Sequence, residues 1–165
     1  MIMNNEELIF IGIILLILYL VFIKKEKNEY QKNSKKFIIK ILKNWKPRGC
    51  KSEKQYETKL MSKFKKEFDD LKSEEHKGSR LVLKGQGDGR NIYDIVIDDK
   101  YFIELKYNLD STGKMDRLIG QLDRYLKKIN SEDFFLILCG KTEDNLLDRI
   151  KEKCEELSIN LYIKK

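Results

Sequence analysis

Apolar residues follow three patterns along this chain, and each pattern predicts a different kind of element. An unbroken apolar run from Leu8 to Ile23 contains no charged residue. Apolar positions three or four residues apart follow from Tyr30 to Trp45 and again from Ser52 to about Glu75, which is the spacing of amphipathic helices. Beyond them, short apolar runs bounded by turn residues are typical of strands. The patterns predict an N-terminal helical region followed by an α/β domain.

The run from Leu8 to Ile23 is long enough to suggest a membrane anchor. A helix of this length spans about 24 Å, and lysine side chains at its end can cover the remainder of a ~30 Å hydrocarbon core. Glu6 and Glu7 precede the run and no small-residue cleavage site follows it, which argues against a signal peptide. We expect residues 1–25 to form a transmembrane helix, with a hydrophobic helix buried in the domain or in an oligomer as the alternative.

The lysine-rich segment after the run predicts the orientation of the chain. Lysines crowd residues 24–36, and this positive charge favours a cytoplasmic location for everything that follows. Residues 26–50 are expected to hold a basic amphipathic helix that lies on the membrane surface or packs on the domain. Pro47 and Gly49 then interrupt the helical pattern, so we place the start of the folded domain at residue 51.

The domain of residues 51–165 alternates between the two periodicities. Ser52 and Gln55 form a plausible capping box for its first helix. Strands are expected at 80–84, 91–97, 101–107, 133–139 and 159–164, with helices at 111–129 and 142–157 between the later ones. The order α-β-β-β-α-β-α-β predicts a mixed sheet with helices on its faces.

Composition limits the chemistry that the domain can perform. The chain has 165 residues and a formal net charge of +7, which favours an anionic partner. Its three cysteines form no C-x-x-C pair and its one histidine, His76, lies near an expected helix end. This pattern argues against a zinc site, a disulfide framework and a histidine-based triad, which leaves carboxylates and lysines for any chemistry.

Asp94, Glu104 and Lys106 place charges within two otherwise apolar strands. If residues 98–100 form a three-residue loop, the residue numbers of every opposed pair sum to 198, so Asp94 faces Glu104 and Lys106 shares their face. Tyr93, Ile95, Ile97, Ile103 and Leu105 would then point the other way. A two-residue loop would instead put Asp94 and Glu104 on opposite faces.

Two opposed carboxylates repel each other unless a cation lies between them. Oxygen ligands of this kind in a partly open site suit Mg²⁺ or Mn²⁺. A neighbouring lysine can help to deprotonate an attacking water and stabilise developing negative charge. Asp94, Glu104 and Lys106 therefore point to metal-assisted hydrolysis.

Tyr93-Asp94 followed by Glu104-Leu105-Lys106 resembles the signature of the PD-(D/E)xK nuclease superfamily, with tyrosine in place of the family's proline. The resemblance covers about residues 52–139 and implies a restriction endonuclease-like αβββαβ core with a mixed sheet, here extended by a C-terminal αβ unit and preceded by the transmembrane helix. The Gly-rich stretch before Asp94 is similar to that of Mrr-like endonucleases and archaeal Holliday junction resolvases.

The resemblance also implies roles for individual residues. Asp94, Glu104 and the Leu105 carbonyl would bind Mg²⁺ or Mn²⁺, Lys106 would be the catalytic lysine, and a first-helix glutamate would join the site. Glu57 is the better placed candidate for that glutamate and Glu67 its competitor. Three further residues would contact nucleic acid: Gln121 and Tyr125, which are similar to the Q-x-x-x-Y element of RecB-like exonucleases, and Arg90 in the Gly-rich stretch. The upstream histidine motif of those exonucleases has no match.

Three functions follow from these observations. The first is a membrane-anchored, metal-dependent deoxyribonuclease acting on DNA phosphodiester bonds. The second is an inactive nuclease-fold module that binds nucleic acid or a protein partner at the membrane. The third is a structural membrane protein that organises an assembly. Cleavage specificity, endonuclease or exonuclease action, homodimer formation and biological role stay open at this point.

Overall fold

The computed structural model describes residues 5–70, 81–82 and 93–164, and within them the side chains of 11–25, 34–67 and 93–164. The chain divides into two units, Met1–Phe37 and Ile38–Lys165. Its elements, in order, are α1 (Asn5–Asn44), α2 (Glu53–Asp70), β1 (Leu81–Val82), β2 (Ile95–Ile97), β3 (Tyr101–Tyr107), α3 (Thr112–Tyr125), the 3₁₀ helix η1 (Ser131–Asp133), β4 (Phe134–Cys139), α4 (Asp144–Glu156) and β5 (Asn160–Lys164). From α2 onward this is the predicted order.

Helix α1 replaces the two N-terminal helices that the sequence suggested. It continues without a break to Asn44, where the segment around Pro47 ends it. Ile38, Ile41 and Leu42 in its last turns are buried, as is Trp45 just beyond it. The end of the predicted amphipathic helix therefore packs on the domain, and the second unit begins at Ile38 rather than at residue 51.

The apolar run assigned to a membrane span is helical. From Ile11 to Ile23 its large side chains are exposed. Within the residues that the structure describes, however, no helix has the length and apolar character needed to cross a membrane, so the predicted transmembrane helix is not confirmed. The run ends at Ile23, and the exposed residues Lys24 and Lys25 follow it directly.

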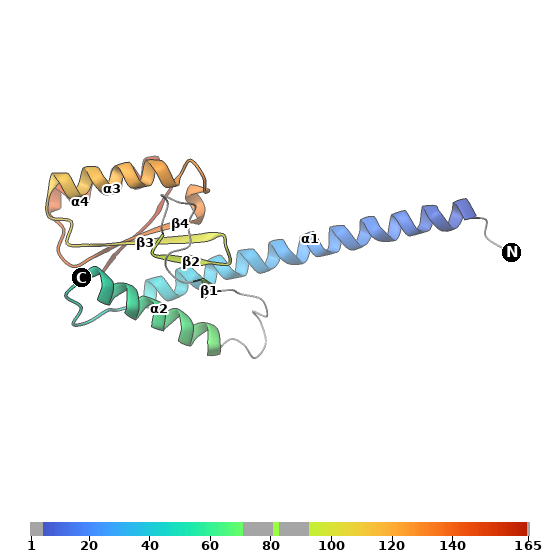
Figure 1. Ribbon diagram of the computed structural model, residues 1–165, viewed down its shortest axis with the longest axis horizontal. Coiled ribbons are helices and arrows are strands. Elements are labelled where there is room, and N and C mark those ends of the chain that lie inside the picture. Colours follow the sequence, from blue (N-terminus) through green and yellow to red (C-terminus); the bar gives the residue numbers. More distant parts are fainter. Residues whose placement is uncertain (1–4, 71–80, 83–92, 165) are drawn as a thin grey trace. The chain divides into compact units, whose positions relative to one another are not determined.

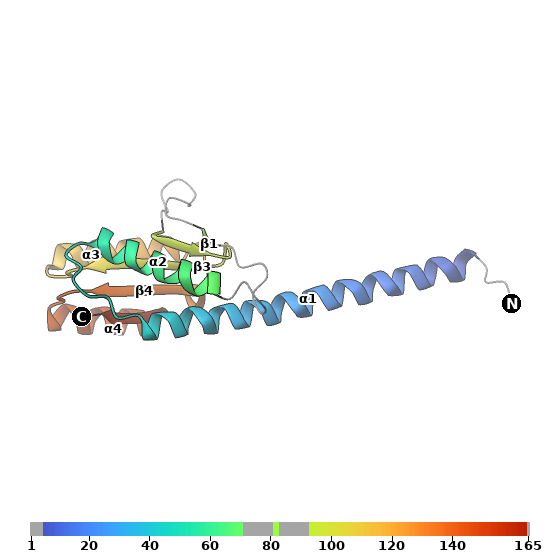
Figure 2. The same ribbon diagram turned by 90° about the horizontal axis from the view of Figure 1, so that it is seen from below.

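The strands form one mixed sheet in the order β1-β2-β3-β4-β5. β1, β2 and β3 pair antiparallel, whereas β3, β4 and β5 pair parallel. Parallel neighbours need crossover connections, and α3 and α4 supply them. Figures 1 and 2 show α3 and α4 along one face of the sheet and α2 along the other. The mixed sheet with helices on both faces was predicted correctly.

Two apolar layers hold the helices to the sheet. On the α3 and α4 face, the central residues of β4 pack against buried positions of both helices, including Leu118, Leu122 and Ile150. On the α2 face, alternate residues of β2 and β3 such as Ile95 and Leu105 are fully buried. Cys139 is 1% exposed and is a core residue.

The hairpin between β2 and β3 has the register that the three-residue loop predicted. Ile97 pairs with Tyr101 and Ile95 with Ile103, so the residue numbers of each pair sum to 198. Asp98 and Asp99 adopt left-handed backbone conformations, with φ of 57° and 51°, which aspartate tolerates better than most residues. The Lys100 N–H donates to the Ile97 carbonyl at 3.1 Å and closes the turn.

Side-chain caps fix where the two helices nearest the hairpin begin. The Ser52 hydroxyl accepts from the Gln55 N–H at 3.4 Å, and the Gln55 side chain accepts from the Lys51 N–H at 2.7 Å. The predicted capping box is thus present, shifted by one residue on its return bond. Ser111 caps α3 by accepting from the Lys114 N–H at 3.4 Å, and α3 ends at Tyr125, before the predicted Ile129.

The residues that follow β3 and β4, Asn108 and Gly140, contact each other where the two parallel strands end. Asn108 has a φ of 51°, and its side-chain oxygen accepts from the Lys141 N–H at 2.9 Å. Gly140 has a φ of 75°, and a Cβ atom there would collide with the Asn108 side-chain oxygen and lie 2.7 Å from the Tyr107 ring. Only glycine fits this corner without displacing its neighbours.

We expect Gly140→Ala to lower the free energy of unfolding by about 2–4 kcal/mol, because it adds left-handed strain to a steric clash. Gly113→Ala is the matched control, since a Cβ there meets nothing within 4 Å. In the first turn of α3 that change should be neutral or slightly stabilising. Urea denaturation of the full-length chain measures both, and equal stability of the two variants would contradict the role of this corner.

Candidate active site

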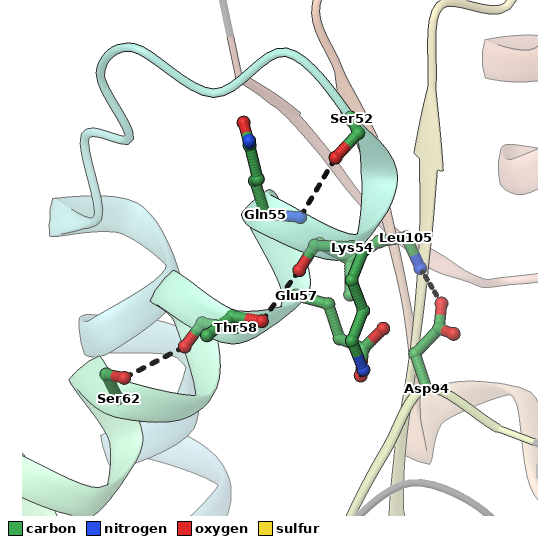
Figure 3. A network of polar contacts seen from close by, with 8 residues as sticks. All are labelled: Ser52, Lys54, Gln55, Glu57, Thr58, Ser62, Asp94 and Leu105. Carbon is green, nitrogen blue, oxygen red and sulfur yellow. Dashed lines mark hydrogen bonds and ion pairs between the residues drawn. The ribbon is translucent and has the colours of Figure 1, made fainter.

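Asp94 lies directly before β2, where the ladder with β3 ends. Continuing the register by one residue beyond the pair Ile95 and Ile103 places Asp94 opposite Glu104. The Asp94 side chain is buried, and its Oδ2 accepts a hydrogen bond from the Leu105 N–H at 2.7 Å (Figure 3). The carboxylate therefore satisfies a backbone donor of the central strand, and this bond holds it beside β3.

Glu104 and Lys106 lie two residues apart on β3 and form an ion pair. The Lys106 Nζ is 2.7 Å from Glu104 Oε1. The Lys106 side chain is 21% exposed and that of Glu104 is 3% exposed. Glu104 Oε2 is buried and has no hydrogen-bond partner among the residues that the structure describes. An unsatisfied carboxylate oxygen inside a protein is costly, so this atom is the clearest indication of a missing ligand.

The electrostatics of Glu104 reflect the same crowding. Burial, followed by the negative charge of Asp94, raises the pKa of Glu104 to about 7, although Lys106 acts in the opposite direction. Glu53 adds a smaller upward effect on this pKa. In the absence of a cation, the site therefore favours a proton on Glu104 at neutral pH and below.

Lys106 responds to the carboxylates around it. Burial would lower its pKa, but the adjacent Glu104 outweighs that effect and raises the pKa above the usual value for lysine. Glu53 and Asp94 act in the same direction as Glu104. Lys106 is thus a firmly protonated donor in this structure, suited to holding negative charge rather than to accepting a proton.

Helix α2 contributes two glutamates to this region. Glu57 is 5% exposed, and Figure 3 shows its carboxylate directed toward that of Asp94. Glu53, one turn earlier, accepts from the Tyr107 N–H at 3.2 Å. Glu67 pairs instead with Lys63, further along the helix. Glu57 rather than Glu67 therefore lies at the site, and Glu53 was missed, although its i, i+4 spacing from Glu57 could have revealed it.

The predicted Q-x-x-x-Y pair on α3 is split between the surface and the core. Gln121 lines a pocket that also includes Lys106. Tyr125 is 3% exposed and packs against Tyr93, with ring centroids 4.7 Å apart. Burial raises the pKa of its phenol, and the charges of Glu104 and Asp94 raise it further. Tyr125 therefore forms the wall behind the carboxylates, and Arg90 lies outside the described residues.

The position of Tyr93 corrects one sequence expectation. It was expected on the face of Ile95, but it belongs to the α3 and α4 core, where it also contacts Phe102 at 4.6 Å. The chain bends at Asp94, before the regular alternation of β2 begins. Strand periodicity therefore could not be extended back to Tyr93.

The carboxylates of this site are few in number for a divalent cation held by protein ligands alone. Within the described part of the chain, no group of three or more His, Cys, Asp or Glu side chains is arranged to hold a metal ion. Mg²⁺, however, commonly takes only one or two carboxylates and keeps several waters. Asp94 and Glu104, with the unsatisfied Oε2 atom, fit a cation of that kind.

Comparison with protein-family models, curated proteins and solved structures finds no match for this chain. The candidate site therefore rests on its own geometry. Its components are two buried carboxylates, one paired lysine and two helix glutamates, gathered where β2, β3 and α2 meet.

The shifted pKa of Glu104 predicts a pH-dependent stability. Between the ordinary carboxyl pKa near 4.5 and about 7, the folded state binds a proton that the unfolded state has released. The free energy of unfolding in EDTA should therefore fall as the pH rises through this window, by at most about 3 kcal/mol. Glu104→Gln should flatten this dependence.

Urea denaturation of the full-length chain between pH 5 and pH 8 measures the effect. Glu67→Gln removes the same charge from a partly exposed position on α2 and serves as the control, so the wild-type slope should persist in it. If wild type and Glu104→Gln show the same slope, the carboxylate is not held as described.

Proposed function

We propose that this protein is a metal-dependent nuclease that hydrolyses DNA phosphodiester bonds, with Asp94, Glu104 and Lys106 as its catalytic residues. The observation that supports this most strongly is the buried Oε2 of Glu104, which has no hydrogen-bond partner among the described residues, on a carboxylate that pairs through Oε1 with Lys106 and feels the charge of Asp94. A purely structural hairpin gains nothing from this arrangement, because buried like charges destabilise it. A site that recruits a cation does gain from it.

Asp94 and Glu104 are the side chains that would hold Mg²⁺ or Mn²⁺, together with the Leu105 carbonyl that the family resemblance adds. A divalent cation bound there would supply Lewis acidity to a phosphodiester oxygen and activate water. Glu57, whose carboxylate is directed toward Asp94, is placed to orient solvent around such a site (Figure 3).

Lys106 has two tasks in this proposal. Its ammonium group contacts Glu104 Oε1 at 2.7 Å and so holds this carboxyl group in place. When a phosphodiester enters, the same group donates to the oxygens on which negative charge develops in the transition state. A fixed donor on a central strand needs little rearrangement to do this, which is the condition for effective electrostatic catalysis.

The element order supports a restriction endonuclease-like fold for this proposal. Residues from α2 to β4 follow the order α-β-β-β-α-β, and the carboxylates and lysine occupy the second and third strands of that order. Asp94 precedes β2, and Glu104-Leu105-Lys106 lies within β3. The PD-(D/E)xK resemblance places its motif at the same two elements.

An inactive module that binds nucleic acid through the same fold is the second candidate. It is favoured by the finding that the described residues hold no group of three acidic, histidine or cysteine ligands. It is also favoured by the ion pair between Lys106 and Glu104, because the lysine already offsets part of the negative charge that would otherwise attract a metal ion. A cleavage assay separates the two candidates, because only the nuclease requires Lys106 for turnover.

We expect Lys106→Ala to lower the rate of plasmid nicking in Mg²⁺ or Mn²⁺ by about 10²-fold or more, equivalent to ~3 kcal/mol of transition-state stabilisation. DNA affinity should change little. Lys151→Ala is the matched control, because Lys151 pairs with Asp148 on α4.

Asp94→Asn should behave differently from Lys106→Ala. It keeps the size of the side chain but removes a carboxylate charge, so nicking should vanish and added Mg²⁺ should no longer stabilise the chain against urea. If wild type and Lys106→Ala nick DNA equally, or if wild type nicks no DNA form, the catalytic proposal is wrong and the binding module becomes the better candidate.

A further inference from the structure

Lys106 of the candidate site also lines a pocket of about 320 Å³, and this pocket carries charges of both signs. Its lining residues are Glu53, Lys106, Tyr107, Leu109, Lys114, Arg117 and Gln121. Glu53 lies beside β3, where it accepts a hydrogen bond at 3.2 Å from the N–H of Tyr107, the residue next to Lys106 in the sequence. Lys114, Arg117 and Gln121 form the end contributed by α3.

The α3 end of the pocket comes from one side of an amphipathic helix. Lys114, Arg117 and Gln121 follow each other at three- and four-residue spacing, so they share a helix face. Leu118 and Leu122, on the adjoining face, are buried in the core. The core contacts of α3 therefore fix the direction in which its polar side chains point.

The cations of this pocket differ in how fully they are engaged. Lys114 donates to the Asn108 carbonyl at 3.1 Å and pairs with Asp110 at 2.8 Å. Arg117 is exposed and makes no ion pair with any residue that the structure describes. Its guanidinium is thus the pocket's available charge, and guanidinium groups suit phosphate because they can donate two parallel hydrogen bonds.

We infer that this pocket holds a backbone phosphate of the nucleic acid next to the one that is cleaved, with Arg117 as its main ligand and Gln121 as a neutral donor. This inference rests on the proposed nuclease function for its substrate. The proposal separates two roles: Lys106 acts on the reacting phosphate, and Arg117 and Gln121 of α3 hold a neighbouring phosphate. Recognition of this kind reads the backbone and not the base sequence.

A second basic pocket offers a matched comparison. It also encloses about 320 Å³, and its lining residues are Lys43, Trp45, Lys46, Pro47, Arg48, Ile163 and Lys164. It contains more cations than the first pocket but none of the candidate catalytic residues and no residue of α3. If DNA bound merely to positive charge, this second pocket would be at least as important as the first.

The test compares Arg117→Gln with Arg48→Gln in the full-length chain. Binding of a short DNA duplex is measured in EDTA, where no cleavage occurs, at several salt concentrations. Arg117→Gln should weaken binding about tenfold and reduce the salt dependence by about one released counterion. Arg48→Gln should leave both nearly unchanged.

Two further readouts separate positioning from general charge. Arg117→Lys should restore part of the affinity, since it keeps the charge but loses the two-pronged contact. In the nicking assay, Arg117→Gln should raise KM with a small effect on kcat, the opposite of Lys106→Ala. Equal effects of Arg117→Gln and Arg48→Gln, or no effect of Arg117→Gln on binding, would overturn the inference.

The outcomes also separate this inference from the nuclease proposal. If wild type nicks DNA and Arg117→Gln binds it normally, the nuclease proposal stands and the pocket inference fails. If wild type binds DNA through Arg117 but never nicks it, the phosphate pocket stands and the catalytic proposal fails. If neither binding nor nicking is detected, both fail.

Discussion

The three-residue turn between β2 and β3 is the constraint on which the candidate site depends. By pairing Ile97 with Tyr101, it decides which side chains of the hairpin share a face. An odd turn puts Asp94 opposite Glu104 and leaves Ile95 and Leu105 for the core, whereas one residue fewer would separate the two carboxylates. Asp98 and Asp99 allow this turn because aspartate accepts the left-handed backbone that it requires. The hydrogen bond from the Leu105 N–H to Asp94 then holds the carboxylate where the ladder ends.

Burial disfavours the charged form of the carboxylates that this turn brings together. Glu104 is desolvated and lies near the charge of Asp94, and Lys106 offsets only one of its two oxygens. The domain can keep such a group because the surrounding sheet is apolar and well packed, with Ile103, Leu105 and Leu136 fully buried. Strain of this kind at one place, supported by ordinary packing everywhere else, is typical of functional sites.

Helix α3 links the core to the proposed substrate contacts. Its buried face packs on β4 and Tyr93, and its other face presents Arg117 and Gln121 to the pocket beside Lys106. The corner of Asn108 and Gly140 is linked to this helix by the hydrogen bond that Lys114 donates to the Asn108 carbonyl, and Tyr107 of the corner also lines the pocket. The site therefore depends on three local features: the turn between β2 and β3, the corner of Asn108 and Gly140, and the side of α3 that lines the pocket.

Local pattern alone was enough to predict the element order from α2 to β5, the mixed sheet, the capping box of α2 and the hairpin register. Each depends on residues close together in the sequence, such as Ser52 with Gln55 or the loop 98–100. Contacts between distant segments required the tertiary structure. The sequence did not reveal that α1 continues unbroken and ends in the domain core, or that Tyr93 leaves the strand pattern at a bend. It also did not show that Glu53 reaches the Tyr107 N–H, that Tyr125 is buried while Gln121 lines a pocket, or that Arg117 lies beside Lys106. Periodicity gives the face of an element on which a residue lies, but only packing decides what that face meets.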